Sequence, residues 1–198
     1  MAIDFTAVRE GHTSYQDATR DLTPADVRPL TEQIFDAVAG IVAGATDADV
    51  VFQPVDPAAH DANAAPGTDA DSGWTLGHVI VHLTAGLEET AALGVTLARG
   101  VEVEGRSRYE TPWETIKTAR QVHDRLAESR RMCLAFRDAW PDRPHLEVTR
   151  VAIPQFGPLD AVRQATMGIF HADSHLDQLR DIMGQAHVAR EWQVASDE

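Results

Sequence analysis

Two pairs of histidines are the residues of this chain whose type and spacing could support chemistry. His78 and His82 form the first pair, and His171 and His175 form the second. Residues four apart in a helix share one face, one turn from each other, so both imidazoles of a pair can reach one metal ion. Two such helices packed together would supply three or four nitrogen ligands. Four filled positions are typical of a structural zinc site, whereas three protein ligands and an open position are typical of a catalytic one.

Several side chains near these pairs are candidates for supporting roles. Asp173 and Asp177 lie beside the second pair and could accept a hydrogen bond from a ligand ring, although we favour their interpretation as surface charges. Glu88 and Glu89 follow the first pair in the chain, and they are candidate general bases. His123 is a third candidate base. For these three residues too, an exposed position is the interpretation that we favour.

Four long helices are predicted to position the histidines. Apolar residues recur at the helical spacing of three and four along four segments of the chain. These segments cover approximately residues 24–44, 75–99, 112–140 and 158–192. The first pair of histidines falls near the start of the second helix, and the second pair falls in the middle turns of the fourth. The predicted fold class is therefore all-α, and the predicted architecture is a four-helix bundle.

Capping residues predict where two of these helices begin and end. Thr75 is a suitable N-cap for the second helix, and Gly100 is a suitable stop. Residues 111–114, Thr-Pro-Trp-Glu, have the pattern of a capping box with proline at the first helical position. This pattern predicts that the third helix begins there and continues until Pro141.

The remaining segments are expected to complete a single domain that spans residues 1–198. Residues 1–22 are polar and mixed, and they predict an N-terminal extension, while residues 193–198 predict a frayed tail. Residues 47–73 are rich in proline, glycine, aspartate and alanine, and they predict a long loop. Residues 141–157 form a second long connection. Both connections are long enough to cross the bundle, so a simple up-down-up-down order of helices is not required.

Composition argues against several classes of protein. The net charge is −14 and the isoelectric point is near 4.9, which disfavours binding to nucleic acid or to an anionic membrane, because both need clustered Lys and Arg. No apolar run approaches the ~20 residues of a membrane span, and the first residues lack the apolar core of a signal peptide. The single cysteine, Cys133, permits no intramolecular disulfide and fits a reducing compartment. We expect a cytoplasmic protein in which Cys133 is buried rather than nucleophilic.

Short motifs around both histidine pairs resemble those of DinB-like proteins. Residues 74–75 (Trp-Thr), followed by residues 82–83 (His-Leu), are similar to the signature with which one helix of these proteins begins. Residues 171–178 (His-x-x-x-His-x-x-Gln) resemble the paired-histidine motif of their last helix. Residues 73–83 are also similar to part of the N-terminal domain of mycothiol-dependent maleylpyruvate isomerase. In the order and length of its helices, the resemblance covers most of the chain.

The resemblance implies a DinB-like bundle that binds a divalent metal ion, zinc or nickel, through three side chains. Carried over residue by residue, the metal ligands are His82, His171 and His175. The surrounding pocket would include His78, Trp74 and Gln178, which support the ligands without being the usual ones. In the isomerase-like branch, one ligand on the last helix is a glutamate. Both positions are histidine here, which favours the DinB-like branch, to which the YfiT-like metalloenzymes also belong.

The resemblance also implies a function that depends on a thiol. Known activities in this superfamily centre on low-molecular-weight thiols such as bacillithiol and mycothiol. We therefore expect a metal-dependent thiol S-transferase, or a thiol-dependent isomerase, that acts on a small-molecule substrate and forms a homodimer. Three alternatives are open: a metal-dependent hydrolase, a non-catalytic metal-binding stress or sensor protein, and a purely structural dimeric bundle.

Overall fold

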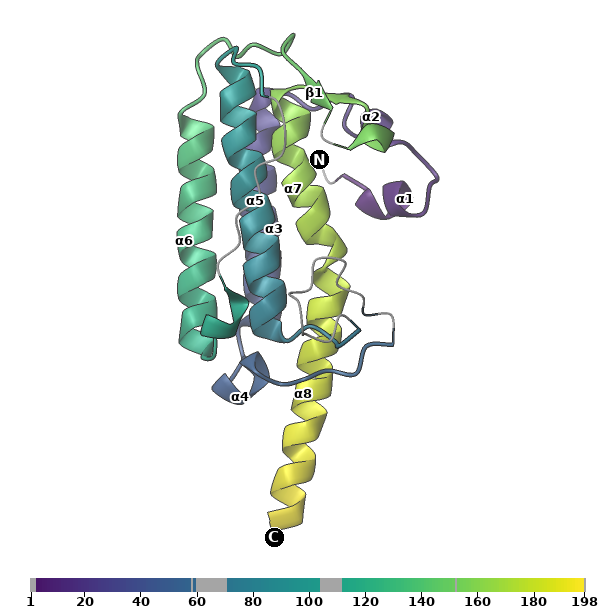
Figure 1. Cartoon of the computed structure of the whole chain (residues 1–198), viewed down its shortest axis with the longest axis vertical. Coiled ribbons are helices and arrows are strands. Elements are labelled where there is room, and N and C mark those ends of the chain that lie inside the picture. Colours follow the sequence, from purple (N-terminus) through teal and green to yellow (C-terminus); the bar gives the residue numbers. More distant parts are fainter. Residues whose placement is uncertain (1–2, 58, 60–70, 104–111, 152, 198) are drawn as a thin grey trace.

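A bundle of long helices forms the body of the protein (Figure 1). The structure is a computed structural model, and it describes residues 3–57, 59, 71–103, 112–151 and 153–197. The long helices are α3 (Pro24–Val42), α5 (Leu76–Ala98), α6 (Ala119–Asp138), α7 (Ala161–Ser174) and α8 (Leu176–Asp197). Figure 1 shows that α7 and α8 continue one another in a single column, and that the end of α8 projects beyond the other helices. The predicted all-α, four-helix architecture is confirmed.

Short elements lie in the connections between the long helices. They are α1 (Phe5–Arg9), α2 (Tyr15–Ala18), α4 (Asp47–Val50), the 3₁₀ turns η1 (Trp113–Thr115) and η2 (Pro154–Phe156), and the strands β1 (Arg150–Val151) and β2 (Pro158–Leu159). The two strands pair antiparallel, with Arg150 opposite Leu159. In the described part of the chain, no helix combines the length and the apolarity that crossing a membrane would require.

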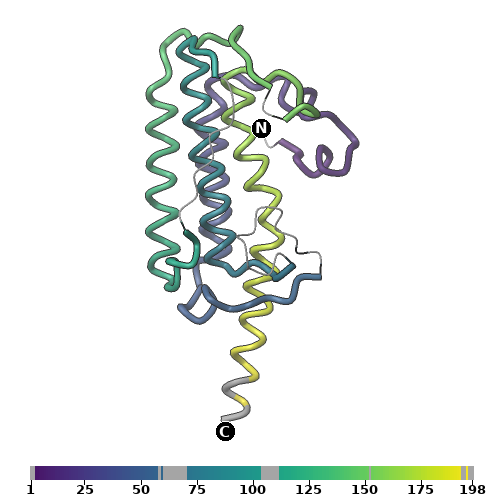
Figure 2. Tube along the Cα trace, in the orientation of Figure 1, coloured from purple at the N-terminus to yellow at the C-terminus, as the bar shows by residue number. Residues whose placement is uncertain are grey.

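Two consecutive long helices, α5 and α6, run parallel. Ile116 lies beside Gly77 at the start of α5, and Arg137, near the end of α6, donates hydrogen bonds to the carbonyl of Pro24 at the opposite end of the bundle. The end of α5 and the start of α6 therefore lie at opposite ends of the bundle. Of the connection between α3 and α5, the described residues 43–57 and 71–75 lie at the end where α5 begins (Figure 2).

The predicted start of the third helix is wrong, and this error concealed the parallel arrangement. Helix α6 begins at Ala119, where Thr118 and Gln121 form a capping box. The Gln121 side chain also accepts a hydrogen bond from the amide of Lys117 (2.8 Å). Residues 113–115 form only one 3₁₀ turn, and Ile116 after it is extended. Thr111 lies outside the described residues. The boundaries of the second helix are confirmed: Thr75 caps α5, and Gly100 follows it with a positive φ of 78°. The fourth helix was expected from about residue 158, but Pro158 and Leu159 form β2, and α7 begins at Ala161 after the N-cap Asp160.

The predicted fourth helix is interrupted at His175. The hydroxyl of Ser174 donates a hydrogen bond to the carbonyl oxygen of His171 (2.6 Å), and the amide of His175 bonds to the carbonyl of Ala172, three residues back (3.1 Å). Serine hydroxyls that bond back to the helix backbone favour a local bend. The expected tail also differs from the structure, because α8 continues as a helix to Asp197.

The N-terminal extension packs on the face of α7 that points away from α5. The rings of Phe5 and Phe170 meet edge to face at 5.4 Å, and the Tyr15 hydroxyl donates a hydrogen bond to the carbonyl of Arg163 (2.8 Å). Residues from α1 and α2 therefore fix α7 from outside while α5 contacts it from inside. The extension is thus an integrated part of the bundle.

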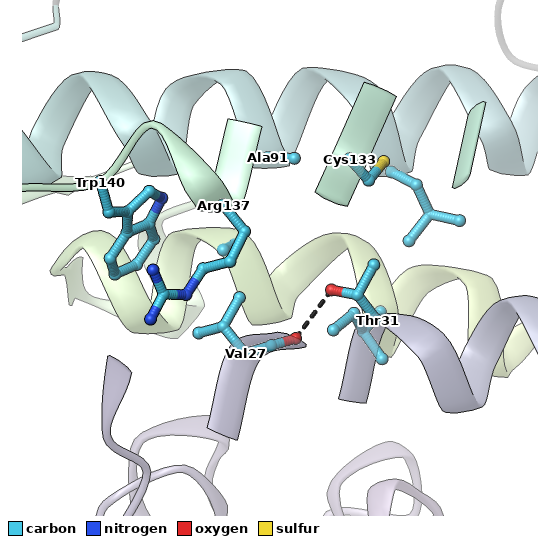
Figure 3. Close-up of a pocket in the computed structure, with 9 residues that line it drawn as sticks. Val27, Thr31, Ala91, Cys133, Arg137 and Trp140 are labelled. Atoms are coloured by element: carbon cyan, nitrogen blue, oxygen red, sulfur yellow. Dashed lines mark hydrogen bonds between the residues drawn. The ribbon is translucent and has the colours of Figure 1, made fainter. Parts of the chain in front are cut away.

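The interior between α3, α5, α6 and α7 is apolar and contains a small cavity (Figure 3). The cavity wall includes Cys133, whose exposed fraction is 3%. Burial raises the pKa of the Cys133 thiol to about 12, so this thiol is protonated and inert at neutral pH. The Thr31 hydroxyl in the same wall donates to the carbonyl of Val27 (2.8 Å). The prediction of a buried cysteine is confirmed.

Candidate metal centre

Three histidine rings converge between α5 and the junction of α7 with α8. The Nε2 atom of His171 lies 3.0 Å from Nε2 of His82 and 3.2 Å from Nε2 of His175. One ring nitrogen from each of the three residues lies within 4.8 Å of the others. Ligand nitrogens bound tetrahedrally to zinc at 2.0–2.1 Å are about 3.3–3.4 Å apart. Two of the three separations are close to this value, so the three half-buried rings could hold a divalent metal ion.

Gln178 determines which nitrogen of His175 faces the other two rings. Its amide oxygen lies 2.8 Å from Nδ1 of His175, and since that oxygen is an acceptor, Nδ1 carries the proton and Nε2 keeps its lone pair. Burial lowers the pKa of His175, and this effect outweighs the opposing effect of the Gln178 hydrogen bond. The neutral ring that a metal requires is therefore favoured. The structure places Gln178 beside His175, the candidate ligand with which the sequence motif associated it.

Small residues allow α5 and α7 to approach closely enough for His82 to reach His171. A Cβ atom at Gly168 would lie 2.0 Å from Oγ1 of Thr90, and one at Gly86 would lie 3.0 Å from Nδ1 of His171. We call this contact the small-residue seam, and it consists of Gly86, Thr90, Gly94, Ala165 and Gly168. Sequence reasoning missed it, although glycines within a helical pattern are a signal of close backbone approach.

An aromatic stack adjoins the three histidines. The His78 ring lies between two indoles, with its centroid 4.2 Å from that of Trp74 and 4.6 Å from that of Trp113, and the interplanar angles are 17° and 6°. The Trp74 ring also meets His82 edge to face at 4.8 Å. Trp113 belongs to η1 and was not predicted as a site residue, because the sequence pattern assigned it to a helix. The structure therefore brings Trp74 and His78 to the site and adds Trp113.

The acidic side chains near the site have other partners. Asp173 forms an ion pair with Arg9 of α1, and Asp177 forms an exposed pair with Arg180. Glu88 forms an ion pair with Arg125 of α6, and the Glu88 side chain is only 16% exposed. The expectation that Glu88 lies on an exposed face is therefore wrong. Each of these three carboxylates is therefore the ion-pair partner of an arginine.

The two remaining candidate bases also lie away from the three rings. Glu89 is half-buried and follows His82 by seven residues, about 10 Å along a helix axis. His123 on α6 is exposed, as expected.

A comparison with known families agrees with these features. The model of the DinB superfamily matches residues 13–179, a range that contains the aromatic stack, all three converging histidines and Gln178. No curated protein and no solved structure matches the chain. Since the matched range is most of the 198 residues, the chain belongs to the DinB superfamily.

Proposed function

We propose that this protein is a cytoplasmic, metal-dependent S-transferase that uses a low-molecular-weight thiol. The observation that carries the proposal is the convergence of three histidine Nε2 atoms, with separations of 3.0 and 3.2 Å. His82, His171 and His175 would be the ligands of a zinc or nickel ion. Three ligands leave a tetrahedral ion one open position, which is the arrangement of catalytic sites.

A bound divalent ion supplies Lewis-acid chemistry, because it lowers the pKa of a thiol or water molecule that binds at its open position. The residues of the chain would position that ion through its ligands: Gln178 holds the His175 ring, and the small-residue seam holds His171 against His82. In the proposed reaction the thiol sulfur forms a bond to an electrophilic carbon. The thiol proton leaves to solvent, and the electron pair of the broken bond departs with the leaving group.

The partners of the acidic residues favour a thiol over water as the nucleophile. Water gives up a proton far less readily than a thiol, whose pKa is ordinarily about 8.5. A hydrolase therefore gains more from a nearby general base that takes up this proton. Asp173, Asp177 and Glu88 are instead paired with arginines. A thiol held by His82, His171 and His175 through a metal ion would need no such base to become nucleophilic at neutral pH.

The proposal is tested by metal analysis followed by a conjugation assay. We expect about one equivalent of zinc or nickel in the purified protein, and we expect the loaded protein to join bacillithiol or mycothiol to a chloronitrobenzene with release of chloride. The variant His171→Ala should lose both properties, whereas His123→Ala, which removes an exposed histidine, should keep them. Failure of the wild-type protein to bind either metal would overturn the proposal. If the protein binds the metal but conjugates no thiol, the result would favour the alternative of a non-catalytic, metal-binding sensor protein.

We also propose that the protein forms a homodimer. Family resemblance supports this, as do two apolar side chains on the projecting part of α8, Val188 and Trp192, which are 51% and 71% exposed. Light scattering should give twice the mass of the chain, and Trp192→Ser should reduce it. A monomeric mass for the wild-type protein would contradict the proposal.

A further inference from the structure

His78 occupies a position from which a fourth ligand would be expected. It lies on α5 four residues before His82, the same spacing that separates His171 from His175. Yet in the described part of the chain, the group that could hold a metal contains only His82, His171 and His175. The reason must lie in what restrains the His78 ring.

The indole of Trp74 lies between His78 and the three converging rings. It stacks on the His78 ring at 4.2 Å, and it also contacts His82 at 4.8 Å and the more distant ring of His175 at 6.1 Å. Trp113 covers the other face of the His78 ring at 4.6 Å. With both faces covered, the imidazole of His78 cannot turn toward the metal centre without displacing an indole.

Both indoles are anchored by contacts of their own backbone segments. A Cβ atom at Gly73, the residue before Trp74, would lie 2.5 Å from the carbonyl oxygen of Pro54. A Cβ atom at Gly77 would lie 2.9 Å from the carbonyl oxygen of Ile116, just after the turn that carries Trp113. The stack is therefore fixed to the start of α5 from two different parts of the chain.

We propose that Trp74, supported by Trp113, is a positioning residue that keeps His78 out of the metal's coordination sphere. This inference rests on the proposed metal centre. Without the indole, His78 would reach the ion from the turn before His82 and would occupy the fourth position. The centre would then become a filled site of the structural type. Trp74 thus preserves the open position at which the proposed substrate binds.

Cobalt(II) bound in place of the native ion provides the test, with azide as a probe of the open position. The visible absorption spectrum of the cobalt-loaded wild-type protein should change when azide is added. The variant Trp74→Ala should lose this response, and the double variant Trp74→Ala/His78→Ala should regain it. Val101→Ala, which removes an exposed apolar side chain outside the stack, is the control and should respond like the wild type. Recovery in the double variant separates the proposed role from a loss of structure.

The possible outcomes distinguish this inference from the proposed function. If the wild-type protein binds no cobalt or zinc, the proposed metal centre fails. If it binds cobalt but Trp74→Ala still responds fully to azide, the role of Trp74 fails alone. Should Trp74→Ala not fold, Trp113→Ala removes the other support, and we expect a weakened azide response that His78→Ala restores. An unchanged response in a folded Trp113→Ala would then overturn the inference, as would a changed cobalt spectrum in the single variant His78→Ala.

Discussion

Helix α5 presents a polar cluster to each of two neighbours, and the two clusters differ in kind. Toward α7 it presents His82, which meets two other histidines. Toward α6 it presents Glu88, which pairs with Arg125 at 2.9 Å, while Nε of Arg125 donates to the hydroxyl of Thr84 (3.0 Å). Thr84 and Glu88 lie about 200° and about 240° around the helix from His82, so the two clusters lie on different faces.

The difference between these clusters is the presence of an opposite charge. The cluster on the α6 side contains a carboxylate and a guanidinium that neutralise each other. The cluster on the α7 side brings together three nitrogens of one kind without an opposite charge among them, and a cation or a hydrogen-bond donor can bridge their lone pairs. A buried polar group that is paired with a group of opposite charge indicates a structural role. Several ring nitrogens of one type that converge on one point indicate that a ligand binds between them. We expect the two faces to respond independently to substitution.

The largest expected effect is on the α6 side. Arg125→Met leaves Glu88 without its counter-charge in a mostly buried position, and this should lower the free energy of unfolding by about 3 kcal/mol. Zinc affinity should not change, because α5 presents a different face to the metal centre. Chemical denaturation and a zinc competition assay measure the two quantities. The double variant Arg125→Met/Glu88→Met should recover most of the stability, and a large loss of zinc affinity in either variant would show that the faces are coupled.

Gly168→Ala should have the next largest effect, this time on the α7 side. The added methyl would meet Oγ1 of Thr90 at 2.0 Å, so α5 and α7 must separate. Overpacking of this kind costs about 2 kcal/mol of unfolding free energy, and it should also weaken zinc binding. Gly40→Ala is the matched control, since nothing lies within 4 Å of its added atom, and it should stabilise the protein by about 0.5–1 kcal/mol. Equal zinc affinity in the two variants would refute the importance of the small-residue seam.

A smaller effect on the same side should follow from Gln178→Ala. Loss of the amide oxygen frees the His175 ring to rotate and to exchange its tautomer. Removal of such a partner typically lowers metal affinity by about 10–100-fold, with little change in the free energy of unfolding. Gln185→Ala, on the same helix, removes a glutamine that bonds instead to Val55 and is the control. An affinity equal to that of the control would show that Gln178 does not orient the ligand.

The smallest expected effect is a pH dependence confined to the α7 side. Burial lowers the pKa of His175 in the folded protein, whereas the unfolded chain takes up a proton near its ordinary value of about 6.5. The metal-free protein should therefore lose stability as the pH falls below about 6.5, and the contribution of His175 should be constant above it. Denaturation curves of the wild type and of His175→Gln across this range check the prediction. The variant should show a shallower decline, and an identical decline would exclude His175 as its source.

The helical periodicity was sufficient to predict the bundle, and the histidine spacing predicted that the two pairs could meet, whereas the choice of His82 over His78 came from the resemblance to DinB-like proteins. Periodicity and spacing are local properties, because a helix fixes which side chains share a face. The start of α6 was mispredicted since two capping patterns, at residues 111–114 and at Thr118–Gln121, compete within a few positions. The ion pair of Glu88 with Arg125 and the position of Trp113 could not be predicted, because each depends on contacts between distant segments whose relative direction the sequence does not reveal.

The interruption at His175 has a mechanical consequence. Helix α8 is 22 residues long, so it is a rod of about 33 Å that begins at the residue next to His175. A rotation of about 5° at that joint moves the far end by roughly 3 Å over such a length. Arg190 steadies the rod against the buried carboxylate of Asp49. A small rotation at His175, a candidate metal ligand, is thus amplified into a larger displacement at the projecting end of α8.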